Sequence, residues 1–260
     1  MNMTHYLQGE FYRTTRRRYL YITFGVCTLL ILAVYLIFFF SNREYEYQDQ
    51  LHLDFVIRGF FPQFLPNIGL YATLIIGDMT FSEEHKVQTM RNTVFYGINR
   101  GTIFFGKFLN NLLFCILLMV GLVGMIFLLG LPLLGLGSTM RDAMETFWPM
   151  MLSCVPLWIG GAALATALYC NIPSGNLAAF SFIGVFLLPT NLLHLAGYIS
   201  GKQFFYDLRG LFLTSRLTEI GESKFAGNPQ FIGICWATGM VFAAIALAAG
   251  FILFRRKEIK

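Results

Sequence analysis

One short segment has the spacing of a phosphate-binding loop. Residues 101–107 read Gly-Thr-Ile-Phe-Phe-Gly-Lys, which fits the G-x-x-x-x-G-K pattern that holds nucleotide phosphates. The next residue is Phe108, where this chemistry needs Ser or Thr to bind Mg²⁺, and no strand is predicted before the glycine. Three bulky apolar residues inside the segment are typical of the start of a membrane helix. We therefore expect this chain to bind no nucleotide or other cofactor itself.

A second candidate chemistry is hydrolysis inside the membrane, with His194 as the base and Ser174 or Ser181 as the nucleophile. Such an arrangement would make the protein an intramembrane protease. The sequence has no Gly-x-Ser-x-Gly elbow and no His-Glu-x-x-His pair. A histidine at the outer end of a membrane helix is the commoner reading of His194, and we favour it over the enzyme.

The composition indicates a protein whose solvent is the bilayer. Of the 260 residues, 56% are hydrophobic and only 13% are charged, whereas a soluble domain has about 25% charged residues. The net charge of +5 comes from basic residues at the ends of apolar stretches, which favours membrane orientation over nucleic-acid binding. The five cysteines lie inside or at the edges of apolar stretches, so no disulfide framework is expected.

Six apolar stretches are long enough to cross a bilayer, which takes about 20 helical residues. We expect an all-α, polytopic protein with a single transmembrane domain over 1–260 and spans at 19–40, 60–77, 103–131, 147–170, 174–196 and 231–254. Residues 1–18 place Leu7, Phe11 and Tyr12 on one helical side and end in arginines, which predicts an interfacial amphipathic helix. An outside segment is expected over 197–230, with a helix over 204–220 at the outer membrane surface.

The basic residues predict the orientation of the spans. Twelve Lys and Arg residues lie in the amino-terminal segment, in 78–107 and in the carboxyl-terminal tail, against seven in the loops on the other side. Because basic loops stay in the cytoplasm, both termini are expected to be cytoplasmic. The predicted location is the cytoplasmic (inner) membrane of a bacterial cell.

The spans contain few residues that could couple transport to an ion. Asp78 is at the inner end of the second span and His194 is near the outer end of the fifth. An ion-coupled carrier usually needs ionisable residues at membrane depth, so their scarcity indicates that energy enters from elsewhere. Two pairs of small residues at helical spacing, Gly161 with Ala165 and Gly239 with Ala243, are predicted to pack helices closely and are less suited to lining a pore.

The polar stretch between the second and third spans predicts a cytoplasmic amphipathic helix within 80–100. Met90, Val94 and Ile98 recur at helical spacing, while acidic and basic residues occupy the other side. Such a helix suits docking into a groove on a soluble partner. The alternative is a helix that lies on the lipid surface.

This stretch resembles the coupling-helix region of ABC-2 type transporter permeases. The resemblance consists of acidic residues after the second span, then Thr89 with Arg91, then Tyr-Gly-Ile-x-Arg over 96–100, then Gly106-Lys107. The basic amino-terminal helix is similar to the elbow helix of that family, and 254–259 is similar to its usual carboxyl end. One departure is Gln88, where many members have Gly before the Thr, which puts the local turn in question.

The resemblance implies a membrane subunit that moves amphipathic substrates such as peptide antibiotics, drugs or lipid-like compounds out of the cell. It implies two copies of a separate ABC ATP-binding subunit, which would carry ATP and Mg, and a second permease chain, identical or paralogous. Contact with the ATPase is assigned by this resemblance to Glu83, Glu84, Thr89, Arg91, Gly97 and Arg100. The alternatives are a secondary transporter or channel and, further off, the intramembrane enzyme.

Overall fold

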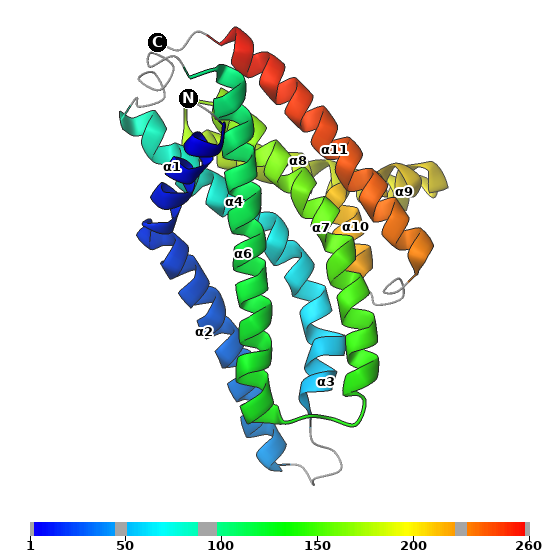
Figure 1. Cartoon of the computed structure of the whole chain (residues 1–260). Helices are drawn as coiled ribbons and strands as arrows, with labels where there is room; N and C mark the ends of the chain where they lie inside the picture. The colour runs from blue at the N-terminus through cyan, green and yellow to red at the C-terminus, as the bar shows by residue number, and fades with distance from the viewer. Residues whose placement is uncertain (1–2, 45–50, 88–97, 222–227, 258–260) are drawn as a thin grey trace.

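The computed structural model describes residues 3–44, 51–87, 98–221 and 228–257, and within these ranges the chain is helical and contains no strand. Six helical stretches are long and apolar enough to cross a membrane, as the sequence predicts. Figure 1 shows α1 (Met3–Thr15) and the last turn of α11 (Pro229–Arg256) at the same end of the bundle, which we call the terminal end. The opposite end, where α6 connects to α7, is called the loop end.

The helices extend past the apolar stretches that predict them. The spans are α2 (Arg18–Ser41), a continuous stretch that ends in α4 (Phe61–Val87), α6 (Arg100–Leu134), α7 (Met140–Asn171), α8 (Gly175–Ser200) and α11. The largest differences are that α4 continues ten residues beyond Gly77, and that the second and fourth spans each begin seven residues early, at Leu53 and Met140. Hydropathy marks only the part of a helix that lipid surrounds, whereas capping and packing decide where the helix ends.

The centre of the bundle is α7, which packs along α11 and α4. Glycine and alanine allow these close approaches. A Cβ on Gly161 would meet Leu70 and Thr73 of α4, and a Cβ on Gly239 would meet the backbone of Pro156 in α7. Ala165 and Ala243 are buried on the same helices. The small residues singled out in the sequence thus lie where helices touch.

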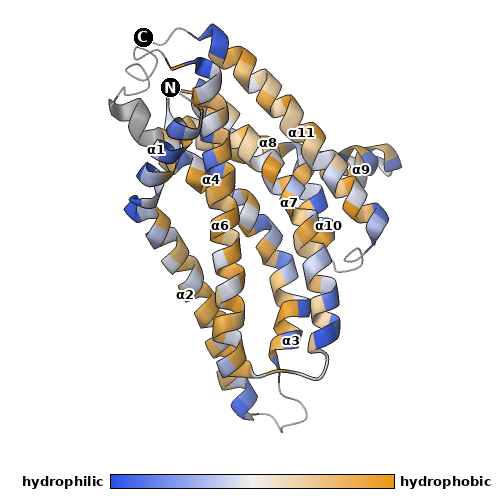
Figure 2. Ribbon diagram, in the orientation of Figure 1, coloured by the Kyte–Doolittle hydropathy of each residue, from blue (hydrophilic) through white to orange (hydrophobic). Residues whose placement is uncertain are grey.

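The first span, α2, lies at the edge of the bundle and buries only Ile31 and Tyr35. The Tyr35 hydroxyl donates to the Ile126 carbonyl of α6 at 2.8 Å. Figure 2 shows apolar residues along the middle of the long helices, with hydrophilic residues gathered on α1 and at the upper ends of α6 and α11. This distribution is that of helices surrounded by lipid between two polar layers.

The loop end is closed by hydrogen bonds between two connections. After α2 comes a 3-10 turn, Asn42–Glu44, and later α3 (Leu53–Phe55) and a π-helical turn, Val56–Phe60, lead into α4. The buried Asp54 carboxylate accepts hydrogen bonds from the backbone N–H and the hydroxyl of Thr139, and Leu53 N–H donates to the Gly135 carbonyl at 3.3 Å. These bonds hold the α6–α7 connection against the start of the second span.

The segment after α8 differs from the single surface helix predicted over 204–220. It forms two short helices, α9 (Gln203–Arg209) and α10 (Leu213–Gly221), with a bend at 210–212. Leu213, Leu217 and Ile220 of α10 are buried, and α10 packs against α4, α7 and α8. The apolar stripe on α10 therefore faces the other helices and not the membrane surface.

Candidate coupling site at the terminal end

The predicted coupling residues lie around the connection from α4 to α6. Glu83 and Glu84 belong to the last turns of α4, and Arg100 is the first residue of α6. Thr89, Arg91 and Gly97 lie outside the residues that the structure describes. The structure does place the end of α4 and the start of α6, on the two sides of this connection. Three sets of polar contacts tie these two helix ends to other helices, and we call the whole arrangement the frame.

The first set docks α1 on the start of α6. Tyr6, Glu10 and Thr14 recur every four residues and form the buried side of α1. The Tyr6 ring lies against Gly106, where a Cβ would clash with it, and Asn110 Nδ2 donates to the Thr14 hydroxyl at 2.9 Å. On the side expected to be apolar, Tyr12 is 60% exposed, whereas the Phe11 ring lies 5.1 Å from the Phe114 ring of α6.

The second set is a buried ion pair. Lys107 is 1% exposed and its Nζ lies 3.3 Å from Glu10 Oε1, while Glu10 is 6% exposed and also accepts from Arg13. The same ammonium lies 4.9 Å from the centroid of the Phe81 ring, and Phe81 stacks on Tyr169. A buried charge is costly unless it is paired, so these contacts hold the four helices that contribute them in one arrangement. Those helices are α1, α4, α6 and α7.

The third set caps α11 and α7 at the terminal end. Arg100 Nη1 donates to the carbonyls of Phe254, Arg255 and Lys257 at 3.3, 2.7 and 2.9 Å. Lys257 Nζ in turn donates to the carbonyls of Cys170 and Asn171, each at 3.1 Å. Burial lowers the pKa of Lys257. Cations at carbonyl ends satisfy acceptors that a helix leaves open and match the negative end of its dipole.

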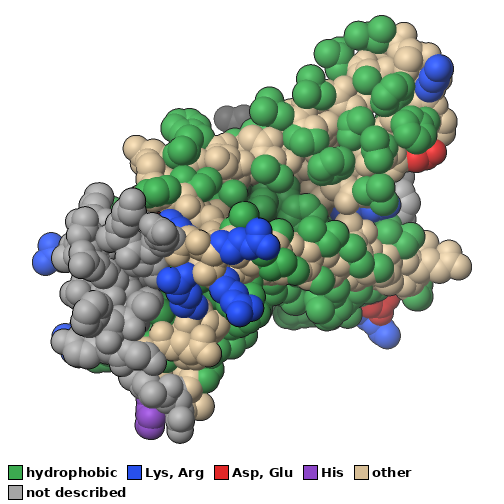
Figure 3. Space-filling model, turned by 90° about the horizontal axis from the view of Figure 1, so that it is seen from above, with side chains coloured by type: hydrophobic (Ala, Val, Ile, Leu, Met, Phe, Trp, Pro, Cys, Tyr) green, Lys and Arg blue, Asp and Glu red, His purple; other side chains and the backbone are tan. Residues whose placement is uncertain are grey.

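A further hydrogen bond links the end of α7 back to α11, since Asn171 Nδ2 donates to the Gly250 carbonyl at 2.9 Å. At the terminal end, α6 is thus joined to α11, and α11 to α7, by side chains that bind backbone carbonyls. Seen from the terminal end in Figure 3, several Lys and Arg side chains gather in one patch. A displacement at the start of α6 must therefore act on the ends of α7 and α11.

A cavity of about 450 Å³ opens close to this frame, between α2, α4, α7 and α8. Its wall combines Arg17, Asp78 and Asn176 with the apolar side chains of Leu74 and Ile75. A wall of this kind can accept a molecule that has both a charged and an apolar part.

The hydrolase arrangement is not assembled. Ser174 caps the start of α8, where its hydroxyl accepts from Leu177 N–H at 3.5 Å. His194 lies on the same helix about 30 Å further along, given the rise of 1.5 Å per residue, and packs edge-on against Tyr206. Ser181, nearer by two turns, is still about 20 Å away along the axis. These residues cannot act together as base and nucleophile.

Sequence reasoning missed the Glu10–Lys107 pair. In the sequence Lys107 counts as a cytoplasmic charge that sets orientation, and Glu10 receives no role. The signal available is the i, i+4, i+8 spacing of Tyr6, Glu10 and Thr14, which places one acidic residue among residues suited to burial.

Comparison with known proteins identifies a family. A family model described as ABC-2 family transporter protein matches residues 6–189, which run from α1 into α8 and include all of α4, α6 and α7. A search of curated proteins finds no match.

Proposed function

Because the chain belongs to the ABC-2 family of transporter membrane proteins, we propose that it is the permease subunit of an ATP-driven exporter of amphipathic compounds. The family implies association with an ABC ATP-binding subunit. In the proposal that subunit hydrolyses ATP with Mg, docks at 80–100 and moves the spans of this chain, which contributes no catalytic residue.

The observation that carries the proposal is the frame around the α4–α6 connection. A partner that pushes on this connection acts directly on α4 and α6. The Lys107–Glu10 pair passes the movement to α1, and Arg100 passes it to α11 and then, through Lys257, to α7. Packed elements joined by polar contacts transmit displacements because they move as units.

The orientation in the proposal places the terminal end in the cytoplasm of a bacterial cell. Supporting this, the tail and the start of α2 both contribute arginines to that end, and basic residues favour the cytoplasmic side. The ATP-binding subunit would then meet α4 and α6 from the side on which ATP is available.

The substrate in the proposal is an amphipathic molecule, such as a peptide antibiotic, a drug or a lipid-like compound. The cavity beside α2 and α8 supports this class, since it joins Arg17 and Asp78 to an apolar wall. We further propose two permease chains, identical or paralogous, each with one ATP-binding subunit. The resemblance in the sequence supports this stoichiometry.

The test is co-purification with the cognate ATPase. Glu84→Lys, or deletion of 83–96, is expected to reduce recovery of the ATPase and to abolish stimulation of ATP hydrolysis by substrate. Glu145→Lys is the matched control, because Glu145 is a 67% exposed glutamate near the start of α7, at the loop end. Full assembly and full stimulation in the Glu84→Lys and deletion variants would reject docking at this segment.

A further inference from the structure

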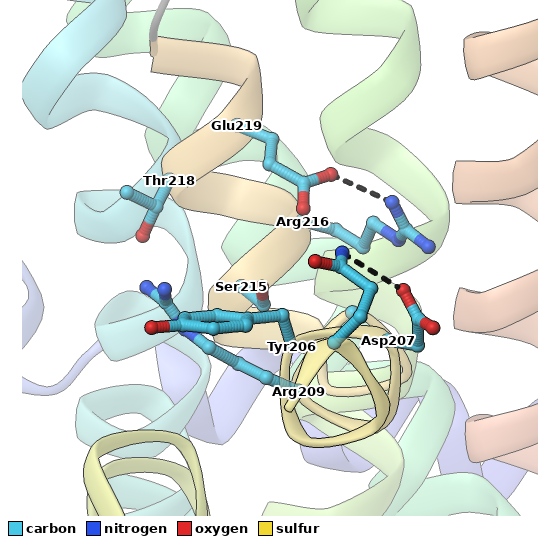
Figure 4. A pocket seen from close by; sticks show the side chains of 9 residues that line it. Tyr206, Asp207, Arg209, Ser215, Arg216, Thr218 and Glu219 are labelled. Atoms are coloured by element: carbon cyan, nitrogen blue, oxygen red, sulfur yellow. Dashed lines mark hydrogen bonds and ion pairs between the residues drawn. The ribbon is translucent and has the colours of Figure 1, made fainter. Parts of the chain in front are cut away.

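A polar pocket lies between α9 and α10, away from the terminal end. Its volume is about 520 Å³ and its lining residues are Gln203, Tyr206, Asp207, Arg209, Gly210, Ser215, Arg216, Thr218 and Glu219. Figure 4 shows the side chains of α9 and α10 facing each other across it, with the Arg216–Glu219 pair on one side. A cavity of this size with several converging polar groups can accept a small ligand or part of a larger one.

The two arginines of the pocket are in different states. Arg216 Nη1 lies 2.6 Å from Glu219 Oε2, so its charge is paired. The Arg209 side chain makes no hydrogen bond or ion pair within the part of the chain that the structure describes, although its Nε, like that of Arg216, is buried without an acceptor. The terminal nitrogens of Arg209 lie beside the Tyr206 hydroxyl and carry no partner among the described residues. Arg209 therefore has donors to offer to an anionic group.

Hydroxyl groups complete one wall of the pocket. In Figure 4 the terminal nitrogens of Arg209 and the Tyr206 hydroxyl lie on the same side, with Thr218 above them. Ser215 lines the pocket although its residue is only 4% exposed. The Thr218 hydroxyl already donates to the Thr214 carbonyl at 2.9 Å, so the donors on this wall are the Arg209 guanidinium and the hydroxyls of Tyr206 and Ser215. Such donors match the oxygens of a phosphate group, which arginine binds through two parallel hydrogen bonds.

A carboxylate on the other side indicates that the ligand is not purely anionic. Among the described residues, Asp207 accepts only from the neutral amide of Gln203, at 3.4 Å. The four charged side chains of the pocket are two arginines and two carboxylates, so its formal charge is zero. With Arg216 and Glu219 paired, one cation and one anion remain, which fits a ligand with one negative and one positive group.

The surroundings of the pocket are apolar. Tyr198 and Ile199 at the end of α8 are 78% and 75% exposed, Phe204 of α9 is 65% exposed, and Leu211 between the two helices is 62% exposed. Exposed large apolar side chains beside a polar pocket belong at a lipid interface, where acyl chains cover the apolar residues and headgroups meet the polar ones.

We propose that this pocket binds the headgroup of a zwitterionic phospholipid of the ethanolamine type, with its phosphate at Arg209 and its ammonium at Asp207. The site needs neither ATP nor a transport direction, so it stands apart from the proposed export function. It would anchor α9 and α10 to the lipid layer on the side of the membrane away from the proposed ATPase.

Native mass spectrometry of the purified full chain tests this proposal. The protein is released from micelles in the presence of phosphatidylethanolamine, phosphatidylglycerol or diacylglycerol of the same acyl chains, and the retained lipid is counted. We expect phosphatidylethanolamine to be retained most and diacylglycerol least. Arg209→Gln should weaken retention of phosphatidylethanolamine roughly tenfold, because it removes a charge-assisted pair of hydrogen bonds. Asp207→Asn should lower the preference for phosphatidylethanolamine over phosphatidylglycerol.

Lys202→Gln is the matched control, since Lys202 is an exposed cation directly before α9 that does not line the pocket. Retention unchanged in Arg209→Gln, in a variant whose melting temperature matches the parent, would overturn the proposal. Equal retention of phosphatidylglycerol and phosphatidylethanolamine would overturn the zwitterionic assignment. Displacement of the lipid by millimolar inorganic phosphate would overturn the lipid as the source of the phosphate.

Discussion

Two arginines at different places in the molecule show how differently the same side chain is used. Arg100, at the start of α6, donates to three backbone carbonyls at the end of α11. The side chain of Arg209, at the end of α9, has no partner among the described residues and lines a pocket. Arg100 belongs to a frame whose donors and acceptors are paired within the chain. Arg209 belongs to the wall of the pocket between α9 and α10, where its hydrogen-bond donors are available to a ligand.

The difference distinguishes residues that stabilise the fold from residues that are available to bind a ligand. A polar group satisfied inside the chain contributes to stability, and its removal should lower the free energy of unfolding. A polar group with no internal partner contributes little, so its removal should change binding and leave folding as it was. Substitutions at the two places therefore test whether the two arginines differ in this way.

The largest effect is expected at the buried ion pair of the terminal end. Lys107→Met leaves the Glu10 carboxylate buried, with Arg13 as its remaining partner among the described residues. Removing one member of a buried pair costs about 3 kcal/mol of unfolding free energy. Denaturant titration in mixed micelles measures this loss, and limited proteolysis should show α1 released from α6.

The matched control for the ion pair is Arg141→Met. Arg141 and Glu145 form an ion pair on the surface of α7, with side chains 89% and 67% exposed. Exposed pairs contribute little because water screens them, so this variant should unfold like the parent. Equal losses for Lys107→Met and Arg141→Met would show that the terminal-end pair is no more important than a surface contact.

A second, smaller loss is expected where α11 crosses α7. Gly239→Val places a branched side chain against the backbone of Pro156, which cannot move aside as a flexible side chain can. Overpacking of this kind costs about 2 kcal/mol. Gly233→Val is the control on the same helix, since a Cβ there meets nothing within 4 Å. The comparison of melting temperatures in micelles decides whether the small residues serve packing, and equal melting temperatures would contradict it.

Arg100→Gln should lower the free energy of unfolding by less, about 1.5 kcal/mol, because a hydrogen bond from a charged donor contributes about that much to stability. The main effect of this substitution should be on the coupling between the proposed ATPase and the spans. If Arg100 links α6 to α11, stimulation of the partner's ATP hydrolysis by substrate should fall while co-purification with the ATPase persists. Loss of co-purification instead would indicate that Arg100 contacts the ATPase directly, as the resemblance in the sequence implies.

The sequence predicts the helices well because their signal is local. Apolar stretches of sufficient length identify all six spans, and the spacing of small residues in α7 and α11 is enough to identify a contact face. The cytoplasmic orientation that the basic residues predict stays a prediction.

The contacts between distant segments were not predictable in this way. The Glu10–Lys107 pair depends on how α1 turns against α6, and Arg100 reaches residues more than 150 positions away in the chain. The bend between α9 and α10 depends on the space that α4, α7 and α8 leave for the buried residues of α10. An amphipathic pattern gives the apolar side of a helix, and only the fold decides whether lipid or protein covers that side.

The smallest effect on stability is expected for Arg209→Gln. In the absence of added lipid this variant removes no hydrogen bond or ion pair among the described residues and relieves a buried Nε that lacks an acceptor. Its melting temperature in detergent should therefore equal that of the parent or exceed it slightly. Added phosphatidylethanolamine should raise the melting temperature of the parent and leave the variant unchanged, because a ligand stabilises only the state that binds it. Destabilisation of lipid-free Arg209→Gln, comparable with that of Arg100→Gln, would mean that both arginines hold the fold and that the pocket has no donor to spare.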